Sequence, residues 1–180
     1  FEMYQKILNE AILELHDTNP IELDMADNSA LLLRDCLLET DVRAMLPTDY
    51  VSSVSERMSL YKELQGMKKE EEVEAFRKKL ADMFGPVPEE AQELLRTIPL
   101  RRKGAEMHLE KISMKNGKLM AYFAPSINSP FYQSELFTRV LAFMQKNHPK
   151  VQIQEHNQKA VLTIHGVPTV KSAVHWLNQI

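Results

Sequence analysis

The sequence predicts an α+β (mixed α/β) protein: a helical first half with a small strand pair, then two β-hairpin–helix units. In the central third, apolar residues recur at three- and four-residue steps, as on one face of a helix. In the last third, short alternating stretches surround turn residues such as Asn116-Gly117, a strong hairpin signal. Hydrophobic residues make up 44% and charged residues 26% of the chain, as in an ordinary globular protein.

The first part of the chain predicts one helix followed by a pair of short strands. Residues 2–16 carry a broad apolar stripe, as an amphipathic helix does. Residues 21–25 alternate strictly between apolar and polar side chains, and residues 41–46 do the same, so we expect these two strands to pair. Residues 30–33 fit either a helical turn or a buried strand.

Two amphipathic helices, separated by a short break, are expected within residues 53–84. Ser53 and Glu56 have the capping-box spacing that begins the first helix, and Gly66 suits a left-handed position after its last turn. Gly85 suits the same position after the second helix, and Pro86 blocks its continuation. The expected buried faces are Val54, Met58, Tyr61 and Leu64 in the first helix, and Val73, Phe76, Leu80, Met83 and Phe84 in the second.

A third helix is expected to begin near Pro88, since proline suits a first helical position. Pro99 should interrupt and kink it, and the helix should resume over residues 101–108. Its expected buried face consists of Ala91, Leu94, Leu95 and Ile98.

The last third predicts two similar units, each a β-hairpin followed by a helix. Asn116-Gly117 marks the first hairpin turn, and Asn157 marks the second. The expected elements are strands at 112–114 and 118–123, a helix over 131–147, strands at 151–154 and 160–165, and a helix over 169–180.

The residues that would carry catalysis are sparse. The five glycines are too far apart for a phosphate-binding loop or a dinucleotide fingerprint, so we expect no enzyme activity, no cofactor and no catalytic residue in this chain. His156 and His165 could face each other across the second hairpin. Two surface imidazoles are expected rather than a metal site.

Cys36 and the acidic run Glu70–Glu72 with Glu74 favour structural interpretations as well. A lone cysteine is usually a small buried hydrophobe, and Asp35 and Glu39 would raise its thiol pKa. The acidic run lies among lysines, which predicts a solvated helix face with pairs four residues apart rather than a metal cluster.

Charge is unevenly distributed along the chain. Residues 1–41 hold ten acids and two bases, whereas residues 42–130 have a net charge of +2 and residues 131–180 of +3. This positive balance is too small to define a nucleic-acid footprint, and no cluster of bases with interleaved aromatics is visible. Arg101–Lys103 forms a small basic run that could touch a phosphate or an acidic partner, but an exposed run is expected.

The compartment is predicted to be the cytoplasm. No apolar run reaches the length of a membrane span, and the start Phe1-Glu2-Met3 is unlike a signal peptide. A single cysteine fits a reducing environment. Because the chain does not begin with methionine, we expect it to be part of a longer protein.

Three short blocks occur in order in the central third. They read Leu46-Pro47-x-Asp49-Tyr50, then Arg57-Met58-x-Leu60-Tyr61-Lys62, then Asp82-x-Phe84-Gly85-x-x-Pro88. Together they resemble the C-terminal domain of the bacterial transcription-repair coupling factors. The dense resemblance covers residues 41–95, and the rest of the chain agrees only in its pattern of elements.

The resemblance implies a regulatory role within a large ATP-dependent DNA translocase. Such a parent displaces stalled RNA polymerase, recruits UvrA to the lesion, and uses ATP and magnesium in its motor. The C-terminal domain holds no motor motif; it packs against the UvrA-binding module of the same chain and masks it. Residues 1–20 would then be a lead-in helix from the motor and residues 21–180 the regulatory domain, whose start could also lie near Asp41.

The resemblance also implies a contact site on the helix before the Phe84-Gly85 break. In the family this contact uses two acidic residues one turn apart. Asp82 matches one of them, and Lys79 stands in the position of the other. Lys79 therefore reverses half of the expected charge. The alternatives are a module that binds nucleic acid or RNA polymerase, or an enzyme of unrecognised type.

Overall fold

The computed structural model describes residues 36–180. The helix predicted over residues 2–16, the strand at 21–25, the segment 30–33 and the proposed lead-in 1–20 lie outside the described residues.

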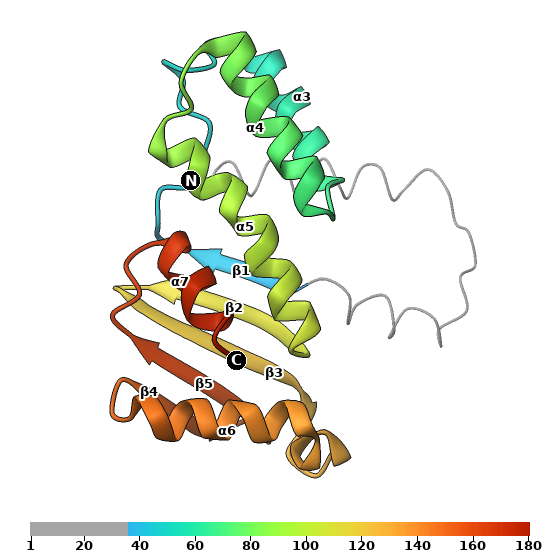
Figure 1. Ribbon diagram of the computed structural model, residues 1–180, viewed down its shortest axis with the longest axis vertical. Coiled ribbons are helices and arrows are strands. Elements are labelled where there is room, and N and C mark those ends of the chain that lie inside the picture. The colour runs from blue at the N-terminus through green and yellow to red at the C-terminus, as the bar shows by residue number, and fades with distance from the viewer. Residues whose placement is uncertain (1–35) are drawn as a thin grey trace, which may run out of the picture. The chain divides into compact units, whose positions relative to one another are not determined.

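One five-stranded mixed sheet forms the base of the described part (Figure 1). The strand order is β1-β2-β3-β5-β4; β1 pairs parallel to β2, and the other pairs are antiparallel. The strands are β1 (Leu37–Thr40), β2 (Leu109–Lys115), β3 (Lys118–Ser126), β4 (Val151–His156) and β5 (Lys159–His165).

Both predicted hairpins are confirmed. In the first turn Asn116 and Gly117 have φ of 54° and 70°, the positive values that a tight hairpin turn requires. In the second, Asn157 and Gln158 have φ of 51° and 61°. The registers pair Met114 with Leu119 and other core residues with one another, so one face of the sheet is apolar.

The strand predicted over residues 41–46 is wrong. The pairing with β2 ends at Thr40. The N–H of Asp41 still donates to Met114 O at 3.0 Å, and after Asp41 the chain leaves the sheet. Beyond that point Val42 packs on the core beneath the sheet, whereas Leu46 enters a second core among the helices. The alternation in this segment therefore reflects a chain that crosses between two cores, not a half-buried strand.

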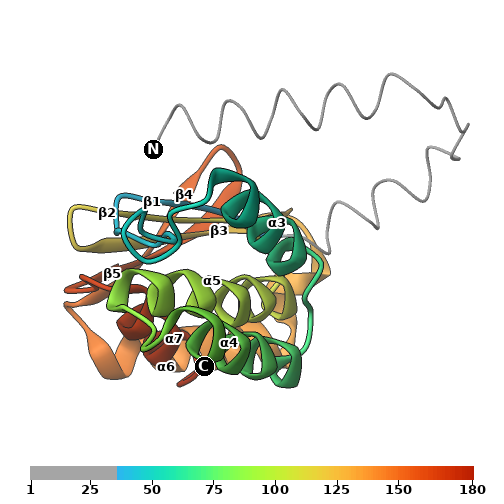
Figure 2. The ribbon, with the colours of Figure 1, turned by 90° about the horizontal axis from the view of Figure 1, so that it is seen from above.

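Five α-helices accompany the sheet in residues 36–180, and α5, α6 and α7 lie on one side of it (Figure 2). A short 3-10 helix, Pro130–Gln133, takes the place of the first turn predicted for the helix over 131–147. The α-helices are α3 (Val54–Gln65), α4 (Glu70–Phe84), α5 (Glu89–Glu106), α6 (Glu135–Asn147) and α7 (Val170–Leu177).

The residues predicted to cap α3 and α4 agree in part with the structure. The Ser53 side chain accepts a hydrogen bond from Glu56 N at 3.3 Å and caps α3 as predicted. Gly85 has the predicted positive φ, 87°, after α4. The left-handed conformation predicted for Gly66 is wrong, because its φ is −78° and its N–H closes a right-handed turn onto Glu63 O.

The predicted buried face of α3 is rotated from the observed one. Leu64 is buried as predicted and Leu60 is buried as well, whereas Val54 is 65% and Met58 40% exposed. Leu46 and Val51 share a core with Leu60, and the Tyr61 hydroxyl accepts a hydrogen bond from Leu46 N at 2.8 Å. On α4, Val73, Phe76 and Leu80 are buried as predicted, and Met83 is exposed.

The predicted interruption at Pro99 is also wrong, since α5 runs continuously from Glu89 to Glu106. Proline cannot donate to the carbonyl four residues earlier, which costs a helix interior about 3 kcal/mol. The two halves of α5 are buried in different cores: Ala91 and Leu95 among α3 and α4, Leu100 and Gly104 against the sheet. Burial on both sides of Pro99 offsets the lost hydrogen bond and keeps the helix continuous.

Candidate functional site

The predicted contact residues lie on the outer side of α4. One side of this helix is buried in the core through Val73, Phe76 and Leu80. Lys79 and Asp82 lie on its other sides and are exposed. Asp82 is in the last turn of α4, three residues before the capping residue Gly85. Within residues 36–180, Asp82 forms no ion pair, although Lys78 lies one turn before it.

Lys79 is neutralised by an acid on the neighbouring helix. Its Nζ lies 2.7 Å from Glu63 Oε2, and the two side chains are 44% and 42% exposed. Glu63 is in the last turn of α3, sixteen residues earlier, so no local spacing in the sequence points to this pair. The reversal of charge at Lys79 is therefore compensated locally, and Asp82 keeps an uncompensated negative charge.

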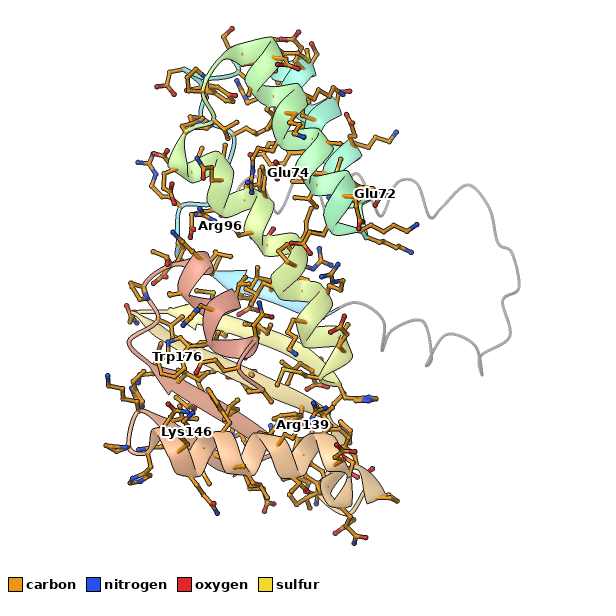
Figure 3. The ribbon with its side chains drawn as sticks, in the orientation of Figure 1. Glu72, Glu74, Arg96, Arg139, Lys146 and Trp176 are labelled. Carbon is orange, nitrogen blue, oxygen red and sulfur yellow. The ribbon has the colours of Figure 1, made fainter. Side chains whose placement is uncertain are left out.

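A shallow groove of about 450 Å³ runs beside this ion pair between α3 and α4. Buried Phe76 and exposed Glu72 are among its lining residues, and Figure 3 labels Glu72 near the start of α4. The backbone N–H groups of Lys68 and Lys69 donate to the Glu72 carboxylate and hold its pKa below the usual range. The groove is lined by Glu63, Gly66, Met67, Glu72, Ala75, Phe76 and Lys79.

The blocks that carry the family resemblance hold α4 in place. The Tyr50 hydroxyl lies 2.8 Å from Gly85 O and 3.0 Å from Leu80 O, so it can donate to either carbonyl at the end of α4. The Tyr50 ring also packs edge to face on Phe84, with centroids 5.7 Å apart. Arg57 donates to Val51 O and so fixes the same loop against α3. These residues position the surface that bears Asp82.

The other candidate residues do not assemble into a site. His156 pairs with Lys159 and His165 with Lys118, at opposite ends of the β4–β5 hairpin, so the two imidazoles do not face each other. Within residues 36–180, no group of three or more histidine, cysteine or carboxylate side chains could hold a metal ion. In the same residues, no helix is both long and apolar enough to span a membrane.

Cys36 is buried as predicted, with 1% of its surface exposed. Burial raises the pKa of its thiol from 9.0 to about 11, and Arg101 opposes this shift. Burial is therefore the largest cause of the raised pKa. In the acidic run, Glu74 pairs with Arg77 three residues on, and Glu70 lies 3.8 Å from Arg102 on α5.

Glu93 is a buried acid that the sequence did not single out. It is 4% exposed and accepts hydrogen bonds from Val170 N at 2.5 Å and Lys171 N at 3.3 Å, at the start of α7. Its Oε1 also lies 2.6 Å from Arg96 Nη1. Partial burial lowers the pKa of the Arg96 guanidinium, but hydrogen bonds to Glu89 and Glu93 raise it, and the net shift is upward.

These features define a class: an α+β domain in which a helical hairpin, α3–α4, is joined through α5 to a sheet covered by helices on one side. A family model described as the TRCF domain matches residues 40–134, which is more than half of the chain. The chain therefore belongs to the TRCF-domain family.

Comparison with curated proteins gives the same family. The transcription-repair-coupling factor of Myxococcus xanthus is 30% identical over 122 residues, which are 66% of this chain and 8% of that protein. That of Escherichia coli (strain K12) is 28% identical over 112 residues, 62% of this chain and 9% of that protein. That of Staphylococcus epidermidis is 23% identical over 163 residues, 91% of this chain and 13% of that protein. The chain thus spans only a small fraction of these relatives.

A solved structure shares the fold. It is described as the crystal structure of the C-terminal domain of transcription-repair coupling factor, and it superposes with a TM-score of 0.64 at 16% identity. The superposition covers 81% of this chain and 92% of that one. At this identity the match establishes the arrangement of helices and strands, and it covers nearly all of that domain.

Proposed function

We propose that this chain is the non-catalytic, regulatory C-terminal domain of a cytoplasmic DNA translocase that couples transcription to nucleotide excision repair. In this proposal the domain masks the UvrA-binding module of the same parent chain by intramolecular docking. The parent would bind RNA polymerase, DNA and UvrA, and its motor would use ATP and magnesium. Membership of the TRCF-domain family supports this proposal.

The observation that carries the docking role is the charge pattern on α4. Glu63 neutralises Lys79 at 2.7 Å, so the uncompensated charge at the predicted contact is the carboxylate of Asp82. A basic surface on the partner module would complement it. Such an intramolecular contact needs little intrinsic affinity, because the two modules belong to one chain and this tether supplies an effective concentration of roughly millimolar order.

The test measures UvrA binding by the full-length parent protein. Asp82→Lys should weaken the intramolecular contact and raise the affinity for UvrA. It removes a carboxylate from the contact and places a positive charge opposite a basic surface. Glu155→Lys is the matched control: it makes the same charge change at an exposed acid on β4. Equal UvrA binding by Asp82→Lys and the unaltered protein, with unchanged stability, would refute docking through α4.

A further inference from the structure

The C-terminal quarter of the chain is poor in acids. Between residues 136 and 180 the only acidic residue is Glu155, and five bases accompany it. In the sequence these bases are spread over more than thirty positions, and no cluster is visible. The structure brings two of them, Arg139 and Lys146, onto one side of α6, and Trp176 of α7 contacts the same helix at Phe143 (Figure 3).

The spacing of Arg139 and Lys146 places their charges in a row. Seven residues are nearly two helical turns, so the two side chains leave α6 in the same direction, about 10.5 Å apart along its axis. Both are exposed, and within residues 36–180 neither forms an ion pair, although Glu135 lies one turn before Arg139. Both cations are therefore available to an anionic partner.

Trp176 on α7 supplies the aromatic component. Its ring packs edge to face on Phe143 of α6, with centroids 5.9 Å apart and an interplanar angle of 78°. Phe143 is buried and Trp176 is half-buried, so the indole is held against the core on one side and reaches solvent on the other. Figure 3 shows Trp176, Arg139 and Lys146 on the same face of the molecule, which we name the α6–α7 face.

We propose that the α6–α7 face binds single-stranded nucleic acid. Phosphate groups would contact Arg139 and Lys146, and a base would stack on the exposed part of Trp176. Positive charge beside a fixed aromatic ring is the combination by which proteins hold single strands without reading their sequence. A duplex offers the phosphates but hides the faces of its bases, and an acidic protein segment offers carboxylates without a base to stack.

Trp176 is the only tryptophan of the chain, so its fluorescence reports directly on this face. The 180-residue chain is titrated with a thymidine oligonucleotide of about 20 nucleotides. Quenching of tryptophan emission that saturates in the micromolar range, at about 50 mM salt, is expected. With two phosphate contacts, the logarithm of the binding constant should fall with that of salt concentration with a slope of about −1.4.

Charge reversal separates this face from general attraction between charges. Arg139→Glu and Lys146→Glu should each weaken binding about tenfold or more at low salt. Lys62→Glu and Lys78→Glu, which reverse exposed lysines on α3 and α4, should leave the affinity within about twofold. Trp176→Phe keeps an aromatic ring against Phe143, so it tests the stacking surface with less risk to the fold; it should weaken binding several-fold.

Three results would overturn the proposal. The first is no change in Trp176 emission at oligonucleotide concentrations up to about 100 µM. The second is equal quenching by polyglutamate or by duplex DNA, which would assign the face to acidic proteins or to phosphate alone. The third is an equal loss of affinity in the control variants on α3 and α4, which would show that binding lies elsewhere.

Discussion

The carboxylate of Glu93, within α5, accepts a hydrogen bond from the backbone N–H of Val170 at 2.5 Å, seventy-seven residues later in the chain. Val170 begins α7, so a buried side chain of one helix satisfies an otherwise unpaired donor at the start of another. The negative charge also lies at the positive end of the α7 dipole. Arg96 neutralises the same carboxylate, and the three groups join α5 to α7.

Glu93→Gln should destabilise the domain by about 1.5–3 kcal/mol, because hydrogen bonds to a buried charged group lose their ionic component. Glu89→Gln is the matched control, since Glu89 also pairs with Arg96 at 2.6 Å but is 67% exposed. That variant should cost less than about 1 kcal/mol. Urea unfolding of the two proteins measures both values; equal losses would show that the bond to α7 adds nothing.

Gly104→Ala should destabilise the domain despite the higher helix propensity of alanine. An added Cβ would lie 2.7 Å from Cys36 Sγ and 3.0 Å from Ile112 Cδ1, and such overpacking costs about 1–3 kcal/mol. At Gly66, where φ is −78° and the nearest atom is 3.5 Å away, alanine should be neutral or stabilising by up to about 1 kcal/mol. Unfolding midpoints compare the two, and Cys36→Ala should relieve part of the Gly104→Ala loss.

Cys36 should react with thiol reagents only after unfolding. Burial raises the pKa of its thiol from 9.0 to about 11, so the folded state favours the neutral form. Because the folded state then binds more protons than the unfolded state between these pH values, this contribution to stability is complete below pH 9 and is lost as the pH rises toward 11. Urea midpoints between these pH values should fall more steeply in the unaltered protein than in Cys36→Ala. Rapid labelling of the folded protein at pH 8 would contradict the burial.

Tyr50→Phe should lower stability by about 1–2 kcal/mol, because the carbonyl groups of Gly85 and Leu80 lose their shared hydroxyl donor. The ring contact with Phe84 is retained in this variant, so the loss reports the hydroxyl alone. Tyr122→Phe is the control, because within residues 36–180 its hydroxyl has only a long contact, 3.8 Å to Met120 Sδ. It should change the free energy of unfolding by less than about 0.5 kcal/mol. Denaturant unfolding would measure both.

Lys79→Glu should strengthen the proposed intramolecular contact and so lower UvrA binding by the full-length parent. It removes the cation that neutralises Glu63, so two further acids join Asp82 on the surface that would face a basic partner. Because the pair is exposed, the fold should lose less than about 1 kcal/mol. Lys118→Glu, at the start of β3, is the control. Increased UvrA binding by Lys79→Glu would indicate that the partner surface is acidic.

The elements that the sequence predicts correctly are those with local causes. Asn116-Gly117 requires a tight turn, Ser53 offers an oxygen to an amide three residues on, and Pro86 cannot continue a helix. Each cause acts within a few residues, so the order of helices and hairpins from Val54 to Leu177 follows from the chain itself. The three blocks of the resemblance are local in the same sense.

Contacts between distant segments were decided only by the tertiary structure. Strand β1 pairs with β2 across some seventy residues, and α5 stays continuous through Pro99 because each of its halves is buried in a different core. The bonds from Glu63 to Lys79 and from Glu93 to Val170 arise only when whole helices pack. Local chemistry defines each helix and strand. Which of their surfaces pack together depends on how all the elements jointly exclude water, so no single stretch of sequence determines the packing.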